Sequence, residues 1–152
     1  MSKKTKSLLT FFSLLLVGYW LAMFVGSHYP HYARFRPPVS GFDKMAHFAG
    51  YAGLAFLLSA VLHFRYLIRS EGKPSPKIMF YLPIVVFSIT AVYGVIDELS
   101  QFPIPGRRPD ILDWYADLAG SLLGLTCFQV AVLLFRKRSF FSFYFQPTPE
   151  ET

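Results

Sequence analysis

Long apolar segments alternate with shorter polar stretches along this chain. The apolar segments cover about residues 8–26, 46–64, 78–96 and 111–135. A helix needs about 20 apolar residues to cross the hydrocarbon core of a bilayer, and each segment approaches or exceeds that length. The strands of a membrane barrel are shorter, at about ten residues, and alternate in hydrophobicity. The pattern therefore predicts an all-α polytopic membrane protein with four transmembrane helices, folded as a single membrane domain over residues 1–152 with a tail at 136–152.

Composition supports a location in the membrane. Hydrophobic residues make up 53% of the chain and charged residues only 16%, whereas about 25% is typical of soluble domains. The single cysteine, Cys127, lies in an apolar run, which excludes a disulfide within the chain and a cysteine-based metal centre. The first apolar run is longer than the core of about 7–15 residues in a signal peptide, so we interpret it as an uncleaved anchor.

The distribution of Lys and Arg predicts how the helices are oriented. Of the 15 basic residues, ten lie before the first apolar segment, between the second and third, or after the fourth. Positive residues accumulate on the cytoplasmic side, so both termini are expected inside, with the loops at about 27–45 and 97–110 outside. This topology accounts for the net charge of +6, and no nucleic-acid partner is expected.

The acidic residues follow the opposite pattern. Of the nine acids, six fall at the predicted outer ends of the helices: Asp43, Asp97, Glu98, Asp110, Asp113 and Asp117. A carboxylate at the centre of a membrane helix costs about 2.5–3.5 kcal/mol, and such groups are normally paired or face water. The partners available at this end are Lys44, His47, Arg107 and Arg108. We therefore expect a mixed polar cluster at the outer end of the bundle.

Helical spacing places several of these groups on shared faces. On the second predicted helix, which begins just before its apolar segment, Lys44, His47 and Tyr51 recur at i, i+3 and i+7. On the third, which continues just past its apolar segment, Asp97 and Gln101 are four residues apart. The predicted consequence is that the polar ends of the second, third and fourth helices face one another.

The fourth segment carries an acidic stripe that continues as a stripe of small residues. Asp113, Asp117, Gly120 and Gly124 follow one another at spacings of four, three and four. Small residues let neighbouring membrane helices approach closely. Gly120 and Gly124 are therefore predicted to mark a helix-packing contact.

The same positions match sequence motifs of a known family. Residues 43–51 read DKMAHFAGY and residues 97–101 read DELSQ, followed by PGR at 105–107 and then by the stripe from Asp113 to Gly124. These elements resemble the D-K-x-x-H-x-x-x-Y, D-E-x-x-Q, P-G-R and D-x-x-x-N-x-x-G-x-x-x-G motifs of the VanZ-like family, named for a teicoplanin-resistance protein. The resemblance covers about residues 40–125. Asp117 departs from it, because the family more often has Asn there.

This resemblance implies a small multi-pass protein of the bacterial cell (inner) membrane, within the cell envelope. It implies no general reaction, substrate or cofactor, and it leaves the oligomeric state open. An influence on glycopeptide susceptibility is one role that the resemblance implies for some proteins, although most members of the family occur outside any glycopeptide-resistance setting.

Three functions remain open, and we favour a non-enzymatic one. In this function, the outward-facing polar site binds either an anionic amphiphile or an envelope partner. The amphiphile would be an anionic lipid or a lipid-linked envelope ligand. The adjacent arginines at 107 and 108 are suited to an anionic head group because a guanidinium binds carboxylate or phosphate with two donors. The predicted ligand-binding residues are Asp43, Lys44, His47, Tyr51, Asp97, Glu98, Gln101, Arg107, Asp113 and Asp117.

The first alternative is an intramembrane enzyme that acts on a lipid-linked phosphate. His47 with Glu98 or Asp113 would form the acid/base pair, and a hard divalent ion could sit among Asp97, Glu98, Asp113 and Asp117. The chain lacks an H-E-x-x-H zinc motif and an evident nucleophile motif, so no metal site is assigned from the sequence and enzymatic activity is disfavoured. The second alternative is a small proton- or ion-coupled transporter.

Overall fold

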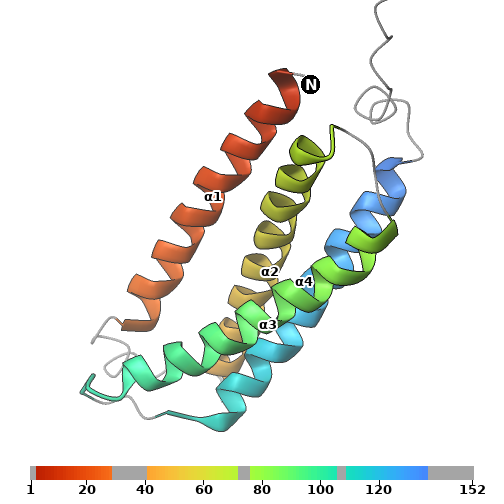
Figure 1. Cartoon of the computed structure of the whole chain (residues 1–152). Coiled ribbons are helices and arrows are strands. Elements are labelled where there is room, and N and C mark those ends of the chain that lie inside the picture. The colour runs from red at the N-terminus through yellow and green to blue at the C-terminus, as the bar shows by residue number, and fades with distance from the viewer. Residues whose placement is uncertain (1–2, 29–40, 72–75, 106–108, 137–152) are drawn as a thin grey trace, which may run out of the picture.

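Four antiparallel helices make up the protein in a computed structural model that describes residues 3–28, 41–71, 76–105 and 109–136. The helices are α1 (Lys3–His28), α2 (Phe42–Arg69), α3 (Pro76–Gln101) and α4 (Ile111–Arg136). All four are long and apolar enough to cross a membrane, and the described residues contain no strand. The predicted all-α membrane fold is therefore confirmed. Figure 1 shows α1 beside α2, with α3 crossing in front of α4. The orientation with both termini inside stays a prediction.

The helices extend beyond the apolar runs from which they were predicted. α2, for example, includes polar residues at both ends, since it runs from Phe42 to Arg69. A helix does not end where its hydrocarbon-facing residues end, because polar side chains at its termini reach the interface while the backbone ladder continues. Gly41, with φ of 86°, lies directly before α2, and Asp110 begins α4 by accepting a hydrogen bond from Leu112 N–H at 2.9 Å.

The tightest pairing in the bundle joins α2 to α4. A Cβ added at Gly120 would collide with the carbonyl oxygen of Phe48, and one added at Gly124 would collide with that of Ala52. The two backbones therefore lie in direct contact, as the small-residue stripe allows. This contact brings the polar residues of α2 and α4 close together.

The helix α1 packs mainly against α2 and only lightly against α3. Tyr19 anchors it, because its hydroxyl donates to the carbonyl oxygen of Gly50 at 3.0 Å. Gly53 leaves the space that the Tyr19 ring occupies, and an added Cβ there would collide with that ring.

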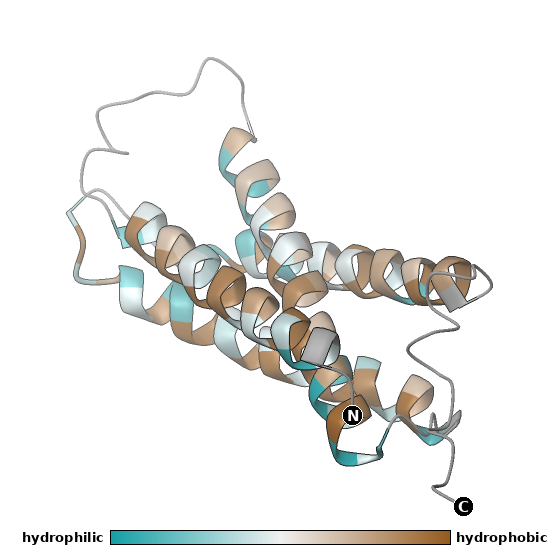
Figure 2. Cartoon of the chain, turned by 90° about the horizontal axis from the view of Figure 1, so that it is seen from above, coloured by the Kyte–Doolittle hydropathy of each residue, from teal (hydrophilic) through white to brown (hydrophobic). Residues whose placement is uncertain are grey.

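Apolar side chains fill the middle of the bundle and the end at which α2 finishes. The buried cluster consists of Ala55, Ala60, Phe64, Leu67, Leu82, Val86, Leu125 and Phe128. Many large apolar residues also point outward, and Figure 2 shows brown, apolar positions along all four helices. An exposed apolar surface of this kind suits contact with lipid.

Candidate functional site

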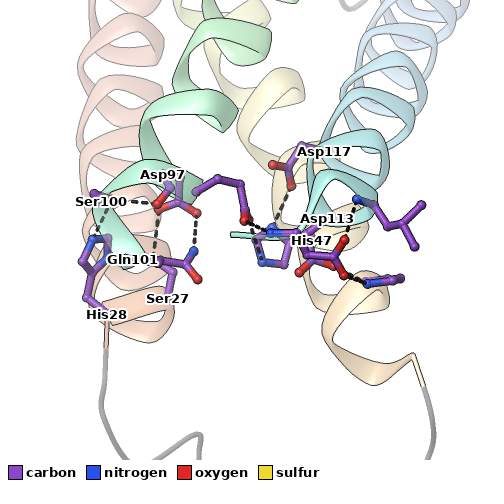
Figure 3. Close-up of polar contacts among 12 residues, drawn as sticks. Ser27, His28, His47, Asp97, Ser100, Gln101, Asp113 and Asp117 are labelled. Carbon is purple, nitrogen blue, oxygen red and sulfur yellow. Dashed lines mark hydrogen bonds and ion pairs between the residues drawn. The ribbon is translucent and has the colours of Figure 1, made fainter. Parts of the chain in front are cut away.

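Buried polar residues gather at the end of the bundle where α1 and α3 finish and α2 and α4 begin. We call this region the polar end. Its buried members are His47, Asp97, Glu98, Gln101, Asp113 and Asp117. Figure 3 shows that they fall into two groups, one around Asp97 and the other around His47.

The Asp97 network, which comprises Ser27, His28, Asp97, Ser100 and Gln101, joins α1 to α3. Both carboxylate oxygens of Asp97 accept hydrogen bonds, one from Ser27 Oγ at 3.1 Å and the other from Gln101 Nε2 at 3.2 Å. His28 Nε2 lies 2.9 Å from Ser100 Oγ, and Figure 3 shows this second contact beside the first. Although Asp97 is only 5% exposed, each of its side-chain oxygens has a partner.

The His47 triad, which comprises His47, Glu98 and Asp117, joins α2, α3 and α4. His47 Nδ1 lies 2.9 Å from Asp117 Oδ1, and His47 Nε2 lies 3.9 Å from Glu98 Oε1. The three residues are 8%, 6% and 0% exposed. Asp117 fits between the helices because it faces Gly94 on α3, where an added Cβ would lie 3.0 Å from Asp117 Oδ2. The imidazole ring is thus held between two buried carboxylates.

Several oxygens in and beside this triad lack partners. Glu98 Oε2 accepts a hydrogen bond from the backbone N–H of Asp110 at 2.8 Å. By contrast, Glu98 Oε1, Asp117 Oδ2 and the hydroxyl of Tyr51 are buried and have no hydrogen-bond partner among the described residues. Most buried polar atoms in proteins are paired, so these three need an explanation.

Lys44 connects α2 to the start of α4. Its Nζ donates to Asp110 Oδ2 at 2.7 Å and to Asp113 Oδ1 at 2.9 Å. The ammonium group lowers the pKa of the Asp110 carboxyl, and the hydrogen bond from Leu112 N–H acts in the same direction. Lys44 therefore neutralises acids at the edge of the polar end, outside the His47 triad.

A partly open pocket of about 170 Å³ lies between α1, α2 and α3 and touches both groups. Its polar lining consists of Ser27, Asp43, His47, Tyr51, Tyr93 and Asp97. Its less polar lining consists of Met23, Gly26, Ala46 and Gly50. The rings of Tyr51 and Tyr93 stack with centroids 5.9 Å apart on one side. The pocket therefore has both polar and apolar lining residues.

All described residues of the predicted ligand-binding set lie at the polar end or line this pocket. Arg107 and its neighbour Arg108 lie outside the described residues. The set omitted Ser27, His28 and Tyr93, which the structure adds. Ser27 and His28 occupy the last turn of α1, and the four-helix topology alone places that turn at the level of Asp97.

The proposed grouping of Asp97, Glu98, Asp113 and Asp117 around one hard ion does not match the structure. The groups of described residues whose ligand atoms come within 4.8 Å of one another are Asp43–His47–Asp113 and His47–Glu98–Asp117. Asp97 belongs to neither, because successive helix residues point about 100° apart. Asp97 consequently faces α1, while Glu98 faces α2 and α4.

A family model described as VanZ/LLP1 matches residues 2–135. This chain belongs to the VanZ/LLP1 family, which confirms the resemblance found in the sequence and extends it through α1. Together with the four apolar helices, membership identifies a VanZ-like, multi-pass membrane protein. No curated protein matches the chain, and no solved structure matches it.

Proposed function

We propose that this VanZ/LLP1-family protein binds the head group of a membrane amphiphile in the pocket between α1, α2 and α3. The main support is that a cavity with charged and hydroxyl-bearing residues in its lining opens within helices that are otherwise apolar on the outside. Polar groups at membrane depth are expensive and usually mark a functional site. A lining that contains both polar and apolar residues suits a molecule that has both characters.

The size of the pocket limits what enters it. Drug-sized ligands occupy about 300–1,000 Å³, and this pocket is smaller at about 170 Å³. It therefore suits a head group whose acyl or prenyl chains stay in the bilayer. The Lys and Arg distribution predicts that this end lies outside, so the ligand would come from the outer leaflet of the bacterial cell membrane.

The charges around the pocket favour a particular arrangement of that head group. Asp43 and Asp97 line the cavity, and carboxylates accept hydrogen bonds from hydroxyl or ammonium groups. The hydroxyl of Tyr51 is buried and offers a donor. We expect the sugar, glycerol or amine part to enter the cavity and the phosphate to lie near Arg107. A lipid-linked envelope ligand would satisfy both requirements.

Native mass spectrometry of the purified full-length protein tests this proposal. The protein is exposed to phosphatidylglycerol, phosphatidylethanolamine and undecaprenyl phosphate in equal amounts. Ala46→Phe fills the pocket and should abolish retention of the preferred lipid, whereas Ala119→Phe, on the exposed face of α4, should retain it. Equal retention by both variants would refute the proposal.

A second variant distinguishes binding of the phosphate from binding of the rest of the head group. Arg107→Ala should weaken retention of phosphate-bearing lipids and leave binding of uncharged head groups unchanged. If a preferred lipid-linked ligand is found, an effect on glycopeptide susceptibility is tested next. Cells that express wild type or Ala46→Phe are grown with teicoplanin and their growth is compared. Equal susceptibility in both strains would exclude that role.

One feature favours a second function, hydrolysis at a lipid-linked phosphate. Asp117 orients His47, whose other nitrogen faces Glu98, and an imidazole held by a carboxylate is suited to general acid–base work. Wild type would then release phosphate from undecaprenyl pyrophosphate, and His47→Ala would not. Phosphate release that is no faster than that of His47→Ala would exclude this function.

A further inference from the structure

We propose that His47, Glu98 and Asp117 together bind a divalent transition-metal ion, such as Zn²⁺ or Mn²⁺, at the polar end of the bundle. This inference goes beyond amphiphile binding and does not depend on it. It rests on the geometry of the three side chains, on their unpaired oxygens and on the balance of charge.

The geometry brings three suitable donors together from three helices. Each residue offers one ligand atom, and these atoms all lie within 4.8 Å of one another. Ligand atoms around a tetrahedral zinc ion are about 3.3–3.6 Å apart, because each lies about 2.0–2.2 Å from the metal. The most widely spaced of these atoms would need to approach one another by about 1–1.5 Å. One imidazole nitrogen with two carboxylate oxygens is a donor set that zinc and manganese accept.

Carboxylate oxygens without a hydrogen-bond donor distinguish the triad from the Asp97 network. Glu98 Oε1 and Asp117 Oδ2 are buried without a hydrogen-bond partner among the described residues, and Glu98 Oε1 faces His47 Nε2 at 3.9 Å. A buried carboxylate oxygen is costly unless a donor or a cation satisfies it. Asp97, at the same end of the bundle, has a donor for each oxygen. Among the described residues, buried carboxylate oxygens without a hydrogen-bond donor thus occur only in the triad.

Charge balance points to a doubly charged ion. A protonated His47 would leave one negative charge uncompensated beside Glu98 and Asp117, in a region where unpaired charge is expensive. A divalent ion with neutral imidazole and two carboxylates gives zero net charge. Lys44 is already engaged with Asp110 and Asp113 at 2.7 and 2.9 Å.

The other cluster that shares His47 is a weaker candidate. It contains Asp43 and Asp113, but Asp113 already pairs with Lys44 and Asp43 is only partly buried. A tightly held ion needs ligands that are not committed elsewhere. The buried triad therefore offers the better site.

Metal titration of the purified full-length protein, with any affinity tag removed, tests the proposal. The protein is stripped with a chelator, titrated with Zn²⁺ or Mn²⁺ and passed over a desalting column, and bound metal is counted by mass spectrometry. Wild type should retain one ion per chain. Glu98→Gln and Asp117→Asn should each weaken binding at least about tenfold, the range expected for loss of a carboxylate that holds or orients the metal.

Asp110→Asn is the matched control, because it makes the same change to a carboxylate at the same end that lies outside the triad. It should bind metal like wild type. The proposal is overturned if wild type binds no ion, or if Asp110→Asn lowers the affinity as much as Asp117→Asn. Weakening by Asp43→Asn but not by Glu98→Gln would move the ion to the other cluster and would equally refute the triad.

A measurement on wild type covers the case in which the variants do not fold. A ligand that binds only the folded state raises the midpoint of thermal unfolding. Zn²⁺ should raise that midpoint and a chelator should reverse the change, whereas Mg²⁺ should act more weakly because it prefers oxygen ligands. An unchanged midpoint with Zn²⁺ would refute the proposal. Amphiphile retention is measured on metal-free protein, so failure of one proposal leaves the other intact.

Discussion

Asp97 and Asp117 are both buried carboxylates at the same end of the bundle, but their surroundings differ. Asp97 lies between α1 and α3, and each of its oxygens accepts a hydrogen bond. Asp117 lies between α2, α3 and α4, and one of its oxygens lacks a partner among the described residues. Burial and charge alone do not separate the two. The supply of donors does, and it suggests that the Asp97 network holds helices together while the His47 triad has carboxylate oxygens left for a cation.

The largest expected effect comes from separating α2 from α4. Gly120→Leu would collide with the backbone of Phe48 and should lower the free energy of unfolding by about 1–3 kcal/mol or more, as overpacking of a tight contact does. It should also abolish metal binding, because it moves Asp117 away from His47. The Asp97 network lies elsewhere and should survive.

Gly18→Leu is the control for this change, because nothing lies within 4 Å of that glycine on α1. Denaturation of both variants in mixed detergent micelles gives the two free energies. Equal losses for Gly18→Leu and Gly120→Leu would contradict the account of the α2–α4 contact.

The next largest effect is expected at the satisfied carboxylate. Asp97→Ala leaves the hydroxyl of Ser27 and the amide of Gln101 without their acceptor, which should cost about 1–3 kcal/mol of stability. It should leave the metal affinity of the triad unchanged. Unfolding measurements together with metal titration check both results. A loss of metal binding with unchanged stability would reverse the roles assigned to the two regions.

A smaller effect on stability is expected at the unsatisfied carboxylate. In metal-free protein, Glu98→Gln removes a buried charge whose Oε1 has no donor. The free energy of unfolding should therefore stay within about 1 kcal/mol of wild type or rise. A loss as large as that of Asp97→Ala would mean that Glu98 is as well paired as Asp97.

The smallest effect concerns Asp110, at the exposed edge. Lys44 lowers the pKa of its carboxyl in the folded state. The pairing therefore stabilises the fold above the unfolded pKa of about 3.9 and is lost as the pH falls through the lowered folded value. Lys44→Met should raise the pKa of Asp110 toward its ordinary value, which a ¹³C NMR titration of the carboxyl measures. An unchanged titration would show that the ion pair is absent in solution.

The sequence predicted the fold because membrane helices require long apolar runs, and four such runs are visible. It also predicted which helix ends carry the polar groups, since positive residues and acids separate along the chain. Helical spacing alone brought His47 and Lys44 onto one face of α2. Gly120 and Gly124 likewise indicated close packing from spacing and size.

The division of the polar end into two regions was not visible in the sequence. Asp97 and Glu98 are adjacent, and which neighbour each one faces depends on the rotation of α3 in the bundle. The contribution of Ser27 and His28 depends in the same way on how α1 docks against α3. Such rotations are set by packing over whole helix faces, which a spacing of a few polar residues does not determine.

The difference between the Asp97 network and the His47 triad is tested most directly by a crystal structure of Zn²⁺-soaked protein in a lipid phase. An anomalous difference map at the zinc absorption edge locates the bound ions. We expect a peak about 2.0–2.2 Å from a nitrogen of His47 and from oxygens of Glu98 and Asp117. We expect no peak beside Asp97. An empty map at the triad, or a peak at Asp97 in its place, would contradict the account.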